Sequence, residues 1–152
     1  MSVPGKSAVW RVLVTGGAGF IGSRLVRRIA TEWRNAAITV IDDFRSGDFR
    51  NLAGFQGELI AADLAKIDLK QFLPPGGFDA IFLLARITDT RVADQRAMCW
   101  DNIESFRRLL EFARDKQVPI TYASSAATYG VDKSAKPNME TDERKPANVY
   151  GF

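Results

Sequence analysis

Blocks of apolar residues alternate with mixed stretches along this chain and predict five strands separated by helices and loops. Strand-sized apolar runs fall at residues 9–14, 37–41, 58–61, 78–84 and 118–122. After the first run, and again in a long segment around residues 91–116, apolar residues recur at helical spacing, and we expect both stripes to face the core. The first stripe comprises Phe20, Ile21, Leu25, Val26, Ile29 and Trp33, and the second Val92, Cys99, Ile103, Phe106, Leu110 and Ala113.

This alternation predicts an α/β fold of the Rossmann type, with a doubly wound parallel sheet of about five strands in one domain over residues 1–152. Parallel strands need crossover connections, and their helices cover both faces of the sheet. The stretch 74–77, Pro-Pro-Gly-Gly, breaks the pattern before the fourth strand, and residues 131–148 are expected to form a surface loop.

A glycine motif follows the first predicted strand. Residues 15–22 read TGGAGFIG, so Gly16, Gly19 and Gly22 are spaced three apart, and Asp42 lies twenty residues beyond the last of them, after the second strand. Such glycines allow a sharp strand-to-helix turn, a close approach of backbone to a pyrophosphate and tight packing of the helix on the sheet. The motif predicts a nucleotide-binding βαβ unit; the alternative is a glycine-rich turn in a flavodoxin-like domain.

The amino-acid composition argues against several other classes of function. The 152 residues are 46% hydrophobic and 26% charged, which is typical of a globular domain, and no apolar run is long enough to cross a membrane. There is no histidine and a single cysteine, so we expect no metal site and no internal disulfide. The net charge of +3 comes from scattered arginines, which argues against nucleic acid. With no signal peptide pattern, the chain is expected to be cytoplasmic.

Four motifs together resemble one family. TGGAGFIG, the pair Asp42-Asp43, YASSAATYG at 122–130 and NVYGF at 148–152 are similar to motifs of the extended short-chain dehydrogenase/reductases, specifically the NAD-dependent epimerase/dehydratase family. The last two motifs most resemble the branch of ADP-L-glycero-D-manno-heptose 6-epimerases. The resemblance implies a nucleotide-sugar substrate and an NAD cofactor. Relatives often dimerise through helices on one face, so it also allows a homodimer through residues 91–116, although packing on the sheet explains that stripe equally well.

The resemblance also implies where the cofactor binds. Gly16, Gly19, Gly22 and the backbone of Phe20 and Ile21 would hold the pyrophosphate, Asp63 and Leu64 would flank the adenine, and Leu84, Ala85 and Asn102 would form or support a wall of the site. Asp42 would accept hydrogen bonds from the adenosine ribose, which favours NAD. Arg45 could instead bind the 2′-phosphate of NADP, or be a solvated loop residue; both interpretations stay open.

In this resemblance Ser125 and Tyr150 are catalytic. A tyrosine phenolate is a suitable base for a sugar hydroxyl once its pKa is lowered from about 10, and a serine hydroxyl can donate to the developing alkoxide. Taken singly, a serine after a strand indicates a turn, and a lone tyrosine indicates a core aromatic. No acidic residue follows Ser125, where Ala126 and Ala127 stand, so an epimerase or ketoreductase is favoured over a dehydratase.

Three departures from the family pattern qualify these roles. Leu83 replaces a usual histidine, Arg86 replaces a usual alanine, and the sequence stops before the lysine expected four residues after Tyr150. That lysine binds the nicotinamide ribose and lowers the pKa of the tyrosine, so we expect no turnover by the chain as given. We also expect the fifth strand to lie at an uncovered sheet edge. Two hypotheses remain: the amino-terminal, cofactor-binding part of an epimerase, or a naturally short, non-catalytic dinucleotide sensor or scaffold.

Overall fold

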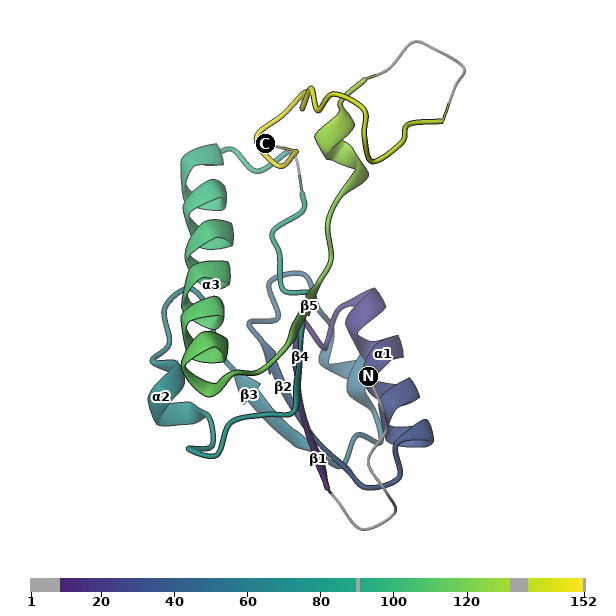
Figure 1. The fold of residues 1–152 in the computed structure, drawn as a ribbon, viewed down its shortest axis with the longest axis vertical. Helices are drawn as coiled ribbons and strands as arrows, with labels where there is room; N and C mark the ends of the chain where they lie inside the picture. Colours follow the sequence, from purple (N-terminus) through teal and green to yellow (C-terminus); the bar gives the residue numbers. More distant parts are fainter. Residues whose placement is uncertain (1–8, 90, 132–136, 152) are drawn as a thin grey trace.

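A computed structural model describes residues 9–89, 91–131 and 137–151. The last residue of the motif at 148–152 and part of the expected loop at 131–148 therefore lie outside the described residues. Five parallel strands form one sheet in the order β3-β2-β1-β4-β5 (Figure 1), which confirms the predicted Rossmann-type fold. The strands are β1 (Trp10–Thr15), β2 (Ala36–Asp42), β3 (Glu58–Ala61), β4 (Ala80–Leu83) and β5 (Ile120–Tyr122).

Helices cover both faces of this sheet. Helix α1 (Phe20–Glu32) packs on one face, and α2 (Leu69–Phe72) and α3 (Gln95–Lys116) lie on the other (Figure 1). Two short 3-10 helices, η1 (Phe49–Leu52) and η2 (Ala126–Tyr129), follow β2 and β5. The central strands are covered on both sides, and the apolar residues Val12, Leu13 and Val14 in the middle of β1 are all fully buried.

Alternate residues of the strands divide between two cores. On the α1 face, Val12, Val14 and Val40 pack with Val26 and Ile29 of the helix. On the opposite face, the core joins sheet residues to α2, α3 and the segments before them; its members include Leu13, Ile41, Phe78, Ile81, Leu83, Leu109 and Phe112. The two layers hold the ends of β1, β2 and β4 in fixed positions, and the loops of the candidate site start from these ends.

The structure corrects the predicted helix stripes. The side chains of Phe20 and Ile21 are 79% and 66% exposed, because α1 faces the sheet through Gly22, Val26 and Ile29 instead. Helix α3 begins at Gln95 rather than near residue 91, and its buried face also differs from the predicted stripe. The buried residues are Met98, Ser105, Leu109, Phe112 and Ala113, whereas Ile103 and Leu110 are exposed, so packing on the sheet does not account for these two.

Strand β5 lies at an edge of the sheet. In the described part of the chain it pairs with β4 alone, from Ile81–Ile120 to Leu83–Tyr122. Tyr122 is 56% exposed, although its ring contacts Phe106 of α3 with ring centroids 5.6 Å apart. The expectation of an open edge at the fifth strand is therefore confirmed for the residues that the structure describes.

Candidate functional site

A pocket of about 300 Å³ lies where the carboxyl ends of β1, β2, β3 and β4 meet. Parallel sheets bind ligands at this edge, next to the point where successive connections turn in opposite directions, here between β1 and β4. Most of the predicted cofactor residues line it: Gly16, Gly19, Asp42, Arg45, Asp63, Leu64, Leu84, Ala85 and Asn102. A larger cavity, about 770 Å³, lies between α1, β2 and residues 51–58, and none of the predicted site residues lines it.

Three glycines of the loop, Gly16, Gly17 and Gly22, have no room for a side chain. Gly16 has φ +70°, and a Cβ there would lie 2.7 Å from the amide nitrogen of Ala85. A Cβ on Gly22 would lie only 2.0 Å from the carbonyl oxygen of Gly16. Gly17, which the sequence analysis did not select, is also closely packed, since a Cβ would meet Val40 Cγ1 at 2.5 Å. The loop therefore turns back tightly onto the end of β4, as a backbone cradle for a phosphate requires.

The N-terminus of α1 differs from those of the other described helices. Asp48, Asp68, Asp94 and Ser125 cap η1, α2, α3 and η2 with a side-chain oxygen. The N-cap of α1 is Gly19, and no side chain among the described residues caps it. The positive end of the α1 dipole therefore has no side-chain acceptor, and this is where a pyrophosphate binds in dinucleotide-binding folds. The glycine cradle and this helix end fit such a group.

Asp42 holds the glycine loop in addition to lining the pocket. It is 7% exposed, its Oδ2 accepts a hydrogen bond from the Ala18 amide at 2.8 Å, and its Oδ1 accepts one from the Phe44 amide at 2.8 Å. The family resemblance implies only a ribose contact for this residue. The structure shows that the carboxylate also ties the loop after β1 to the loop after β2.

We expect Asp42→Asn to lower the free energy of unfolding by about 2 kcal/mol, because the amide keeps one acceptor and its NH₂ group would face a buried backbone N–H. Urea unfolding followed by tryptophan fluorescence measures this. Asp79→Asn is the matched control: Asp79 is exposed and accepts one bond, from the Arg11 amide at 2.7 Å. Equal losses in the two variants would contradict a structural role for Asp42.

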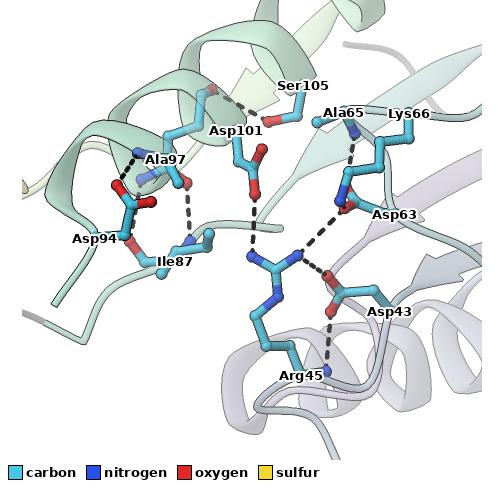
Figure 2. Close-up of polar contacts among 11 residues, drawn as sticks. Asp43, Arg45, Asp63, Ala65, Lys66, Ile87, Asp94, Ala97, Asp101 and Ser105 are labelled. Carbon is cyan, nitrogen blue, oxygen red and sulfur yellow. Dashed lines mark hydrogen bonds and ion pairs between the residues drawn. The ribbon is translucent and has the colours of Figure 1, made fainter. Parts of the chain in front are cut away.

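Arg45 lies among three carboxylates from three different elements (Figure 2). Its guanidinium is 3.2 Å from Asp43, 3.2 Å from Asp63 and 3.3 Å from Asp101 of α3. Burial lowers the pKa of Arg45, but the carboxylates, Asp43 foremost, outweigh burial and raise it. Lys66 adds a second cation, 2.7 Å from Asp63. Arg45 is thus an exposed loop residue whose guanidinium belongs to an ion-pair cluster at the pocket.

Asn102 fixes the loop after β4. Its Nδ2 donates to the carbonyl oxygen of Ile87 at 3.0 Å, and its Oδ1 accepts from the amide of the same residue at 2.9 Å (Figure 2 shows Ile87 beside α3). Both polar ends of the side chain are thus engaged with the backbone of residue 87. In this structure Asn102 holds the wall of the pocket in place.

The candidate catalytic residues lie on neighbouring segments outside the pocket lining. Ser125 caps η2, and its Oγ accepts from the Ala127 amide at 3.1 Å. Tyr150 is half-buried in a turn closed by a 3.1 Å bond from the Gly151 amide to the Asn148 carbonyl. A Cβ on Gly151 would lie 2.4 Å from the Ala127 carbonyl oxygen, so this turn packs directly on η2.

Comparison with known proteins identifies the family. The model of the NAD dependent epimerase/dehydratase family matches residues 12–152. The chain belongs to this family. Among solved structures, it is 41% identical to ADP-L-glycero-D-manno-heptose-6-epimerase from Helicobacter pylori, with a TM-score of 0.86 over 95% of this chain and 47% of that one. It is 28% identical to a UDP-N-acetylglucosamine 4-epimerase from Methanobrevibacter ruminantium, with a TM-score of 0.82 over 94% of this chain and 46% of that one.

A curated protein similar to this chain is also an epimerase. The chain is 34% identical to ADP-L-glycero-D-manno-heptose-6-epimerase from Alkalilimnicola ehrlichii in an alignment of 148 positions, which covers 93% of this chain and 44% of the relative. The chain therefore spans less than half the length of the epimerases it matches. Within the described residues no helix is both long and apolar enough to cross a membrane, and no cluster of three acidic or cysteine side chains could hold a metal ion.

Two departures from the epimerase pattern have clear places in the structure. Leu83 is 1% exposed and belongs to the core under α3. Arg86 lines the pocket, donates to the carbonyl oxygen of Asn102 and lies 5.4 Å from the centroid of the Phe106 ring. Burial lowers the pKa of this guanidinium, and the nearby hydroxyl groups of Tyr150 and Tyr122 oppose that effect. Arg86 is thus a half-buried charged group in the pocket lining, held between the loop after β4 and α3.

Proposed function

We propose that this chain is the cofactor-binding part of an NAD-dependent nucleotide-sugar epimerase. The observation that carries the proposal is the pocket between β1 and β4, in which the glycine loop meets an α1 N-terminus without a side-chain cap. Membership of the NAD dependent epimerase/dehydratase family supports it. The substrate class is inferred from the similar proteins, which are epimerases of nucleotide-linked sugars.

In this proposal the chain's own residues divide into two groups. The backbone around Gly16, Gly19 and Gly22 holds the pyrophosphate, with the Phe20 and Ile21 amides of the first helical turn as donors. Asp63 and Leu64 flank the adenine, and Leu84 and Ala85 form the wall that Asn102 supports. NAD, when bound, supplies hydride acceptance from a sugar carbon and its return.

The second group acts on the sugar. Tyr150 takes the proton from the hydroxyl of the reacting carbon and gives it back, and Ser125 donates a hydrogen bond to the same oxygen as charge develops there. The packing of the Tyr150 turn on η2 supports a joint site for both side chains.

Cofactor binding is tested with Gly19→Ala. A Cβ at this position would lie 3.2 Å from the Gly16 carbonyl oxygen, so the variant should fold with only a small adjustment. Its methyl group would nevertheless stand at the helix end that holds the pyrophosphate, so we expect NAD affinity to fall about tenfold or more, which corresponds to about 1.4 kcal/mol. Titration calorimetry measures the affinity, and thermal unfolding confirms the fold.

The control for this experiment is Gly54→Ala. Gly54 has φ +80° and open space around its Cβ position, and it lies outside the pocket of the glycine loop. It should lose a little stability and bind NAD as the unmodified chain does. If Gly19→Ala and Gly54→Ala bind NAD equally well, the pyrophosphate does not bind at the α1 N-terminus.

The second candidate is a non-catalytic dinucleotide sensor. The observation that favours it is Arg86, a large charged side chain in the pocket lining, at a position where the family resemblance implies alanine. Both candidates require dinucleotide binding and differ only in catalysis. An assay of epimerisation by the full-length protein therefore separates them.

A further inference from the structure

The ion-pair cluster around Arg45 has an excess of negative charge. Its carboxylates are Asp43, Asp63 and Asp101, and its cations are Arg45 and Lys66, so one negative charge is left over. Asp42 adds another negative charge in the lining of the same pocket. We propose that Asp43, Asp63 and Asp101 hold Arg45 in ion pairs and so make this pocket select NAD and reject NADP. This inference rests on the proposed binding of a dinucleotide in the same pocket.

The fold, rather than one flexible segment, positions the three carboxylates. Asp43 directly follows β2, Asp63 follows β3, and Asp101 projects from the second turn of α3 (Figure 2). One terminal nitrogen of the guanidinium contacts Asp43 and Asp63, and the other contacts Asp101. Both terminal nitrogens of the fork, which would bind a phosphate in two places, are therefore already paired with carboxylates.

A 2′-phosphate would have to displace at least one of these partners. Its charge of about −2 would then face the displaced carboxylate and Asp42 as well as Arg45, so this repulsion would offset the new ion pair with Arg45. The other arginine of the pocket, Arg86, is engaged by the Asn102 carbonyl and the Phe106 ring on the β4 side. A 2′-hydroxyl has the opposite property, since it can donate a hydrogen bond to a carboxylate such as Asp42.

The chain offers a precise test of this selection. Titration calorimetry with NAD and NADP should show NAD binding more tightly, by about tenfold to a hundredfold at low salt. Asp101→Asn keeps the shape of the side chain and removes one charge from the cluster. We expect it to raise the affinity for NADP about three- to tenfold and to leave the affinity for NAD within about twofold.

Asp115→Asn is the matched control, because it makes the same charge change near the other end of α3, where Asp115 pairs with Arg114 at 3.1 Å. It should change neither affinity. Since the effect is electrostatic, the preference for NAD should also shrink as sodium chloride is raised from about 50 mM to 500 mM.

These measurements distinguish a failure of NAD selection from a failure of dinucleotide binding itself. Equal affinities for NAD and NADP, or tighter binding of NADP, would overturn the selection by the cluster and leave dinucleotide binding intact. An unchanged NAD/NADP ratio in Asp101→Asn would also overturn it. Binding of neither dinucleotide by the folded chain would overturn the proposed function together with this inference.

Discussion

Gly22→Ala is expected to prevent stable folding or to cost about 3 kcal/mol or more. The added Cβ would lie 2.0 Å from the carbonyl oxygen of Gly16 and 2.8 Å from Gly17 Cα. Both are backbone atoms in the turn between β1 and α1, so the overlap can be relieved only by moving the helix away from the sheet. Val26 and Ile29, on the same face of α1, would then lose part of their packing in the core.

Gly54→Ala serves as the comparison here as well. It adds the same atom at φ +80° without a neighbour within 4 Å, so only backbone strain remains, about 1 kcal/mol. Urea unfolding measures the difference in stability between the two variants. Tryptophan fluorescence follows it, since the ring centroids of Trp10 and Trp33 lie 5.3 Å apart beside α1. If the two variants unfold at the same urea concentration, close packing at Gly22 does not limit the position of α1.

Tyr150→Phe in the full-length protein is expected to lower kcat by about 10² to 10⁴, the usual contribution of a general base. Phenylalanine keeps the ring in the turn that packs on η2 and removes only the hydroxyl that exchanges the proton. KM for the nucleotide sugar and the affinity for NAD should change little, because the glycine loop and the wall of the pocket are untouched.

Tyr129→Phe is the matched variant, since Tyr129 is a half-buried tyrosine at the end of η2, next to the same turn. It should keep nearly full kcat. Similar kcat values for the two variants would contradict the assignment of Tyr150 as the base. A full-length protein that binds NAD and shows no epimerisation with any nucleotide sugar tested would favour the sensor instead.

The fold was readable from the sequence because it depends on local and repetitive signals. Strand-sized apolar runs located all five strands, and the spacing of Gly16, Gly19 and Gly22 located the turn into α1. Each signal describes a few neighbouring residues, whose preference for strand or turn is decided by their own backbone and side chains. The parallel order of the sheet then follows from the alternation of strands and helices.

The helix faces were less predictable. Apolar residues stand on more than one face of α1 and α3, so the sequence pattern offered several stripes that differ by a rotation of the helix. Packing resolves the choice: α1 meets the sheet through Gly22, and α3 through Leu109 and Phe112, which leaves Phe20 and Ile103 exposed.

By itself, the sequence determined the Rossmann-type sheet and the region of the candidate site, since residues that follow parallel strands must meet at one edge. Only the tertiary structure decided what Asp42 and Arg45 do there. Asp42 accepts from the amide of Ala18, 24 residues before it, and Arg45 reaches Asp101, 56 residues away on α3. Contacts over such distances depend on how helices and strands pack together, and no spacing along the chain encodes them.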